Sequence, residues 1–341
     1  MRYPEVRRAH IVPRCYLSNF AVDDTVALSI DGEFVDHPVS IDDAAVRRTF
    51  YRRTRPDGTK IDDVEWSLSQ LEGKLAERLR HIRQDWPPPT LEEKCALAEF
   101  FAFQFVRGPR WKAWHKEQGE NAIVELRRNP EPMRHPSGLW LPVTQEAINE
   151  LEDNFLSETN WLTRMTSIAS LLTGIFGSMR WHLIEFAEPL LAISDHPITA
   201  WGLREEERWP EPTPAGIGAL NFLEVRVPVA PTLALLMTWQ DHSTAESVVA
   251  GSEEIAANLN AFTIASAARQ WMHRPGATVP IANGPQDPIG PQLIPGYGPA
   301  EAEASRARRM ISERIQPKLG QDIHDAVDEN GHRTVEVVNV S

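Results

Sequence analysis

Six polar side chains stand where the surrounding pattern of the sequence predicts apolar or plain solvent-facing residues. They are His10, Glu72, Gln104, Arg107, Asp195 and His196. Imidazole and carboxylate groups exchange protons or bind a divalent cation, and an arginine can hold an anionic substrate. Because functional sites break local sequence rules, we expect His10, Glu72, Gln104 and Asp195 to converge around one pocket. We assign catalytic roles to His10, Glu72, Gln104 and Asp195, and ligand binding to Arg107 and His196.

Helical periodicity sets Glu72 and Gln104 apart from their neighbours. The apolar stripe around Glu72 comprises Leu68, Leu71, Leu75 and Leu79, and Glu72 lies at its edge. Gln104 lies among the apolar residues of segment 95–106, where an unpaired buried amide costs about 1–3 kcal/mol. Each has a structural alternative: an ion pair with an arginine for Glu72, and a hydrogen bond to nearby main chain for Gln104.

The other candidates lie in loops or at the end of an element. His10 belongs to an extended entry three residues before Pro13, and Arg107 ends a predicted helix. Asp195 and His196 follow a short apolar strand, and loops at strand ends often carry function. The structural alternatives are a lone structural histidine, a surface ion pair for Arg107 and an ordinary turn at Asp195.

The elements that position these residues follow an order of strands, helices, strands and a last helix. Predicted strands cover residues 25–41, with a hairpin turn at 31–32, and residues 45–53, 189–193, 222–229 and 232–239. Predicted helices cover residues 62–82, 90–107, 109–128, 144–156, 161–186 and 252–272. This order predicts an α+β fold, a helix-rich single domain with a small, mainly antiparallel sheet. We expect the helices between residues 62 and 128 to pack as one antiparallel group.

The chain divides into three parts by composition. Residues 8–274 form the main α+β domain, and residues 275–299 hold seven prolines and five glycines, which indicates an arm or linker. Residues 300–341 comprise a charged helix at 300–316 and a polar tail. We expect residues 277–341 to be dispensable for folding of the domain. The charged helix is a candidate contact between subunits.

The charge balance argues against a general nucleic-acid binder. The 341 residues carry a net charge of −13, and the first 130 residues hold 21 basic and 21 acidic residues, so the whole excess follows them. An acidic protein repels phosphate backbones. Five arginines in segment 47–55 could still contact them, so nucleic acid is retained as the less favoured partner. A small-molecule or phosphate-containing substrate is favoured. No apolar run reaches membrane-spanning length and there are two cysteines, so we expect a cytoplasmic protein with no membrane partner.

Common catalytic and nucleotide-binding motifs are absent from the sequence. There is no G-x-x-x-x-G-K-[ST], G-x-G-x-x-G, H-E-x-x-H, G-x-S-x-G or C-x-x-C, so any active site is assembled from distant residues. We favour a hydrolase-type enzyme, with a metal-assisted phosphodiesterase or nuclease as the candidate reaction and a divalent metal as the candidate cofactor. The alternative is a non-catalytic binding or regulatory module in which the same residues form a buried structural network. The sequence leaves the choice between enzyme and module open.

Several segments of the sequence resemble a known bacterial family. They are HIVPRCYLSNF (10–20), WSLSQLEGKLA (66–76), LAEFFAFQFVRGPR (97–110), AISDHPI (192–198), VRVPVAPTLALLM (225–237) and the helix around 258–260. In this order they resemble the family described as domain of unknown function 4238, over about residues 8–274. The resemblance implies that its characteristic polar positions are His10, Glu72, Gln104, Arg107 and Asp195, and it implies no reaction. The family more often has asparagine at the position of His196.

Overall fold

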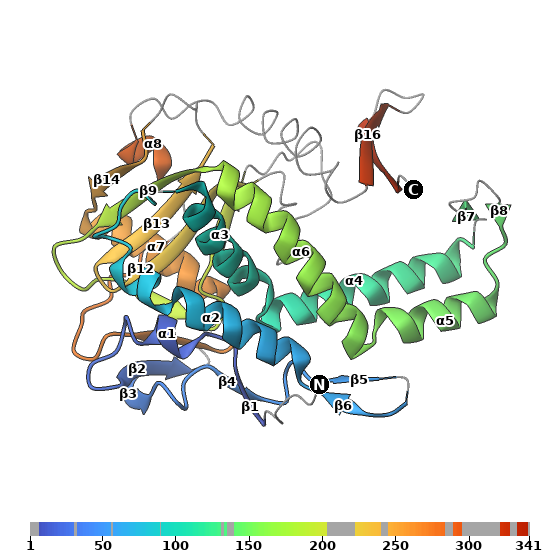
Figure 1. The fold of residues 1–341 in the computed structure, drawn as a ribbon, viewed down its shortest axis with the longest axis horizontal. Helices are drawn as coiled ribbons and strands as arrows, with labels where there is room; N and C mark the ends of the chain where they lie inside the picture. The colour runs from blue at the N-terminus through green and yellow to red at the C-terminus, as the bar shows by residue number, and fades with distance from the viewer. Residues whose placement is uncertain are drawn as a thin grey trace.

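The computed structural model describes most of the chain. The described residues are 7–30, 33–55, 57–88, 90–130, 133–134, 140–202, 222–239, 245–283, 289–294, 321–327 and 333–339. Figure 1 shows the strands of the two larger sheets at one end of the molecule and long helices that extend from them. The predicted charged helix at 300–316 and the predicted turn at 31–32 lie outside these residues.

Two larger sheets confirm the α+β fold class. One has the order β10 (Ala192–Ser194), β15 (Gln270–His273), β2 (Thr25–Ile30) and β3 (Glu33–Ser40), and its neighbouring strands are antiparallel. The other has the order β11 (Thr199–Gly202), β12 (Phe222–Ala230), β13 (Leu233–Thr238), β9 (Arg180–Glu185) and β14 (Ser247–Ala250). In this second sheet β14 runs parallel to β9, and the remaining pairs are antiparallel.

Four helices within the described ranges begin directly after a residue whose side chain caps them. The bounds of the helices are α1 (Arg14–Leu17), α2 (Asp63–His81), α3 (Leu91–Val106), α4 (Pro109–Arg128), α5 (Gln145–Phe155), α6 (Glu158–Ser178), α7 (Glu253–Ser266) and α8 (Gly290–Leu293). The side chains of Thr90, Thr144, Ser157 and Ser252 each accept a hydrogen bond from the first turn of the helix that follows. None of the helices within the described ranges is long and apolar enough to cross a membrane.

The helices between residues 62 and 128 do not pack chiefly on one another, contrary to our expectation. α3 packs most extensively along α6, and α4 along α5. Figure 1 shows α4 and α5 side by side, directed away from the sheets, with β7 (Met133–Arg134) and β8 (Trp140–Leu141) at their far end. The reason is that α3 is apolar on nearly every side, so it can be enclosed by α6 and the sheet as well as by α2.

Two predicted helices are too long. α6 ends at Ser178 and the chain continues into β9, while α7 ends at Ser266 before β15. β9 lies between β13 and β14, so its residues 181–184 are all buried. A short, buried strand rich in apolar residues has the same composition as a buried helical segment, and periodicity cannot distinguish them. The strand predicted at 45–53 is interrupted too, because Thr49 has a positive φ of 48° between β4 (Val46–Arg48) and β5 (Arg53–Thr54).

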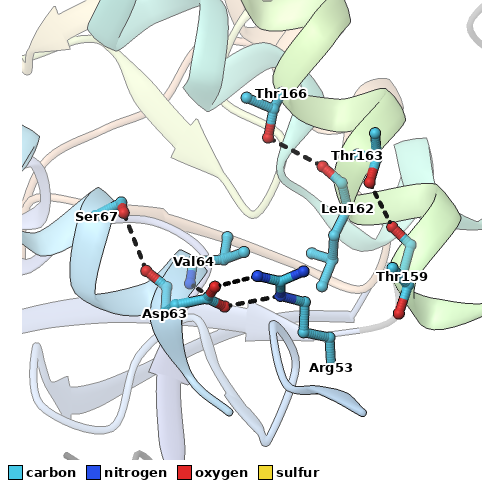
Figure 2. A network of polar contacts seen from close by, with 8 residues as sticks. All are labelled: Arg53, Asp63, Val64, Ser67, Thr159, Leu162, Thr163 and Thr166. Carbon is cyan, nitrogen blue, oxygen red and sulfur yellow. Dashed lines mark hydrogen bonds and ion pairs between the residues drawn. The ribbon is translucent and has the colours of Figure 1, made fainter. Parts of the chain in front are cut away.

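Ion pairs fasten the start of α2 to the segment that precedes it. Arg52 donates to both carboxylate oxygens of Asp62, at 3.0 and 2.9 Å. Arg53 forms the equivalent pair with Asp63, which also accepts a hydrogen bond from the main-chain N–H of Val64 (Figure 2). β5, which carries Arg53, pairs with β6 (Lys60–Ile61) and contacts α6. Two of the arginines in the basic segment 47–55 are therefore already neutralised within the protein.

The described part of the proline-rich arm packs on the domain, which argues against the expected dispensability of this segment. Ile289 and Ile294 belong to the main hydrophobic core. The carboxylate of Glu224, fully buried on β12, accepts the main-chain N–H groups of Ile289 at 3.1 Å and Gly290 at 2.6 Å. Asn260 of α7 donates to the carbonyl oxygen of Pro280 at 2.8 Å. Side chains of the domain thus supply hydrogen bonds to a segment whose prolines limit the hydrogen bonds it can form with itself.

The tail after residue 320 contains regular structure that the sequence analysis did not predict. β16 (Gln321–Val327) pairs antiparallel with β17 (Arg333–Asn339) in a two-stranded sheet.

Candidate functional site

Arg107 lies at the centre of a buried polar network at the end of α3. Its side chain is 3% exposed, and Nη1 donates to Oε1 of Glu72 at 2.6 Å. Nε donates to the hydroxyl of Tyr51 at 3.0 Å, and that hydroxyl donates back to the carbonyl oxygen of Arg107 at 3.1 Å. Nη2 donates to the carbonyl oxygen of His10. One guanidinium therefore joins α2, α3, β1 (Arg8–His10) and the turn that contains Tyr51.

These contacts favour a positioning role for Arg107 over the predicted role in ligand binding. Burial acts to lower the pKa of Arg107, but the nearby Tyr51 and Glu72 outweigh this effect and raise it. The guanidinium is thus permanently charged, and each of its three nitrogens already donates to a protein oxygen. The contact of Glu72 with Arg107 is the structural alternative considered for that carboxylate.

Glu65 is a second carboxylate on the same face of α2, seven residues before Glu72. Within the described residues, its buried Oε2 has no hydrogen-bond partner. Burial raises the pKa of Glu65 to about 7; the charge of Arg107 opposes this rise, and Glu72 and Asp62 add to it. We call Tyr51, Glu65, Glu72, Arg107 and His10 the Arg107 cluster. A carboxyl that titrates near neutral pH beside a buried cation has the properties of an acid–base group.

Sequence reasoning did not single out Glu65, because acidic residues are common in the first turn of a helix. The signal that could have found it is its spacing from Glu72. Seven residues correspond to nearly two helical turns, so both carboxylates lie on the same side of α2.

Gln104 lies next to the Arg107 cluster, and its side chain and that of His10 both contact main chain. Gln104 is 1% exposed, and its Nε2 donates to the carbonyl oxygen of Ile11 at 2.8 Å. Its Oε1 has no partner among the described residues. Nε2 of His10 lies 3.3 Å from the carbonyl oxygen of Ile41. Burial lowers the pKa of His10, and this contact with Ile41 and the charge of Glu72 oppose the shift.

The carboxylate of Asp195 forms its hydrogen bonds with a different part of the chain from the Arg107 cluster. Its carboxylate accepts main-chain N–H groups from three consecutive residues, Ala268 at 2.7 Å, Arg269 at 3.1 Å and Gln270 at 3.4 Å. Burial raises the pKa of Asp195, and the main-chain hydrogen bonds oppose this rise. The carboxylate fixes the connection between α7 and β15, so its contacts agree with a structural role rather than with the predicted catalytic one.

His196 lies against α3 and the start of α4. Its ring centroid is 5.5 Å from that of Phe105. Burial lowers the pKa of His196 to about 3, and the charge of Arg110 lowers it further. Its buried Nδ1 has no partner in the described part of the chain and lies 3.6 Å from the position that a Cβ at Gly108 would take. The imidazole is therefore neutral at physiological pH.

We expect wild-type protein to lose stability in acid through His196. In the unfolded chain the imidazole takes up a proton below about pH 6.5, whereas the folded protein resists protonation down to about pH 3. Its contribution to the free energy of unfolding is thus complete above pH 6.5 and falls as the pH drops, by about 2 kcal/mol at pH 5. His196→Asn should lack this loss. Urea unfolding of both proteins at pH 5 and pH 8 measures it, and equal pH dependence would contradict the buried, neutral state.

The six predicted residues thus form two neighbouring groups. His10, Glu72, Gln104 and Arg107 are linked through α3 and β1, whereas the carboxylate of Asp195 faces the loop after α7. The groups approach each other at Gly108, where a Cβ would lie 3.2 Å from the carbonyl oxygen of Asp195. Convergence around a single pocket remains a prediction.

Within the described residues, no group of three or more histidine, cysteine, aspartate or glutamate side chains is placed to hold a metal ion. Cys15 lies near Glu72 and Arg107, and burial raises its pKa to about 11, with Glu72 adding to the rise and Arg107 opposing it. Its thiol is therefore protonated at neutral pH and is a poor nucleophile.

The fold and these two groups define an α+β protein with a buried, arginine-centred polar network. The family model described as protein of unknown function (DUF4238) matches residues 8–277, so the chain belongs to this family and the resemblance seen in the sequence is confirmed. No curated protein and no solved structure matches the chain.

We expect Glu65→Gln to stabilise the protein above neutral pH. Below about pH 4.5 the carboxyl of Glu65 is protonated in both the folded and the unfolded state, so its ionisation costs nothing. Between pH 4.5 and 7 the unfolded state loses the proton first, and wild-type stability falls. Above pH 7 the loss is complete, at about 3 kcal/mol. Urea unfolding should show a gain for the variant that grows through this window, and a gain independent of pH would contradict the assignment.

Proposed function

We propose that the chain is a hydrolase-type enzyme in which Glu65 is the proton-transfer group and the other residues of the Arg107 cluster position it. The observation that carries this proposal is the buried, unpartnered carboxylate oxygen of Glu65 beside Arg107. A packed fold has no need of such a group, because leaving a buried polar atom unpaired costs stability. Groups of this kind concentrate at functional sites.

The reaction that fits a single acid–base carboxyl is hydrolysis of an ester, with a phosphodiester as the proposed substrate. In its ionised form Glu65 would take a proton from an attacking water molecule while the water oxygen forms the new bond to phosphorus. The bond to the leaving oxygen then breaks, and Glu65 returns the proton to that oxygen. The fixed charge of Arg107 and the hydroxyl of Tyr51 would hold the geometry and the pKa of the carboxyl through both steps.

Turnover of chromogenic esters tests this function. We expect the wild type to release p-nitrophenolate from bis(p-nitrophenyl) phosphate, and Glu65→Gln to lower the rate by about 100-fold or more. Glu77→Gln changes an exposed carboxylate on the same helix and should have no effect. Circular dichroism and melting curves confirm that the variants are folded. Failure of the wild type to hydrolyse the diester, or equal rates for wild type and Glu65→Gln, would contradict the proposal.

A non-catalytic binding or regulatory module is the second candidate function. It is supported by the contacts of Gln104, Arg107 and Asp195, each of which bonds the main chain of a distant segment. Such bonds are those of a buried network that fixes the fold. A module predicts that Glu72→Ala lowers the melting temperature while the wild type hydrolyses no ester.

A divalent metal remains a proposed cofactor for the hydrolase. Metal analysis of purified wild-type protein and of Glu72→Ala tests it: stoichiometric metal that the variant loses supports the metal-assisted reaction, and equal metal content in both proteins contradicts a role for Glu72 as ligand. Nucleic acid as the less favoured partner, assembly through the charged helix and a cytoplasmic location also remain proposals.

A further inference from the structure

The N-terminus of α4 is a helix end without a protein cap. Gly108 is the N-cap residue, no side chain caps the helix, and its first turn contains no acidic residue. α4 is 20 residues long, so its first N–H groups carry the partial positive charge of a complete helix. Such an end attracts anions. The missing side chain at Gly108 lets the carbonyl oxygen of Asp195 and Nδ1 of His196 come close to the main chain at this point.

His196 is a second and independent feature of this place. The residue is 8% exposed, and its Nδ1 is buried without a hydrogen-bond partner in the described residues. This nitrogen faces the N-cap of α4, 3.6 Å from where a Cβ of Gly108 would lie. A neutral imidazole can carry its proton on Nδ1, so the atom can donate to an anion placed at the helix end.

The charges around the helix end are positive. Arg110 stands in the first turn of α4, and one of its terminal nitrogens donates to the carbonyl oxygen of Ala265 at 2.8 Å. Arg47 on β4 acts electrostatically on Asp195, the neighbour of His196. The carboxylate of Asp195 is occupied by three main-chain N–H groups, which already offset its charge. Arg110 is thus the charge that acts on His196 at the helix end, and Arg47 acts on the neighbouring residue, Asp195.

The indole of Trp111 is another donor in the first turn of α4 that has no partner within the described residues. Trp111 is 7% exposed, and its Nε1 has no partner among the residues described. Its ring packs against Phe105, as the ring of His196 does, at a centroid distance of 6.2 Å. Both side chains therefore border the same phenylalanine beside the start of α4.

We propose that the N-terminus of α4, together with His196, Arg110 and Arg47, binds the phosphate group of a small molecule. The first N–H groups of α4 and the Nδ1 of His196 would donate to the phosphate oxygens, and the two arginines would balance the charge. A phosphate fits this set better than a carboxylate does, because its oxygens can accept from donors on several sides. The proposal concerns binding alone, so it does not depend on the role of Glu65.

Calorimetric titration with inorganic phosphate at constant ionic strength tests this site. We expect saturable binding to the wild type, weakened about tenfold or more by Arg110→Gln and by Arg47→Gln. Gly108→Ala should abolish binding, because its Cβ would lie 3.2 Å from the carbonyl oxygen of Asp195 and 3.6 Å from Nδ1 of His196. The arginine variants keep the test decisive should Gly108→Ala disturb the fold.

Arg48→Gln is the matched control, since Arg48 is the exposed neighbour of Arg47 on β4. It should bind phosphate as the wild type does. Parallel titrations with p-nitrophenyl phosphate distinguish a free phosphate ligand from an organic phosphate ester, which would bind more tightly. Absence of saturable phosphate binding, or equal weakening by Arg48→Gln and Arg110→Gln, would overturn the proposal. Loss of hydrolysis in Glu65→Gln with phosphate binding retained would separate this site from the acid–base group.

Discussion

Arg107→Met is expected to lower the free energy of unfolding by about 3–5 kcal/mol, the cost typical of breaking a buried ion pair from one side. The substitution keeps an unbranched, apolar stem and removes every donor. Glu72, the hydroxyl of Tyr51 and the carbonyl oxygen of His10 would then lose their shared partner. Urea unfolding followed by circular dichroism measures the change.

The control for Arg107→Met is Arg83→Met. Arg83 also pairs with a carboxylate, Glu185, but both side chains are about half exposed, at 48% and 47%. Exposed pairs of this kind contribute little, so no measurable change in unfolding is expected. Similar losses in the two variants would show that the Arg107 cluster does not hold its four segments together.

Truncation after Arg274 is expected to destabilise the domain severely. It removes the main-chain donors from Ile289 and Gly290 to the buried carboxylate of Glu224, which among the described residues would keep its contact with Arg226 alone. It also removes Ile289 and Ile294 from the core, at about 1.5–3 kcal/mol for each side chain. We expect insoluble protein or a melting transition that is no longer cooperative.

Truncation after Ile294 provides the matched comparison for this effect. It retains α8 and both buried isoleucines, so its melting temperature should stay within a few degrees of that of the full chain. If the chain that ends at Arg274 melts like the one that ends at Ile294, the contacts of residues 275–294 contribute nothing to the fold.

Much of the fold could be predicted from the sequence because its signals are local. The α+β class, the capped starts of α3 and α5 and the Pro109 start of α4 follow from periodicity and capping residues. The transition from α6 to β9 could not be predicted. β9 is buried by pairing with β13 and β14, which lie more than 45 residues further along the chain. The packing of the proline-rich arm depends on Glu224, a residue equally remote in sequence from the arm.

In the candidate site, too, the features that depend on contacts between distant segments could not be predicted from the sequence. Gln104 could be recognised as anomalous because it breaks an apolar pattern, and its burial at 1% exposure agrees with that inference. Its partner, the carbonyl oxygen of Ile11, could not be inferred, since it depends on how β1 lies against α3. Glu65 breaks no pattern in the sequence. Its unusual pKa arises only when folding removes water and brings Glu72 and Arg107 close to it.

The central claim, that Glu65 is an acid–base group, is tested most directly by its own titration. Carbon-13 NMR of glutamate side-chain carboxyls, recorded against pH, gives the pKa of each group, and Glu65→Gln identifies the signal of Glu65. The structure predicts a midpoint at about pH 7 for this carboxyl. A midpoint near the ordinary value of 4.5 would contradict the account.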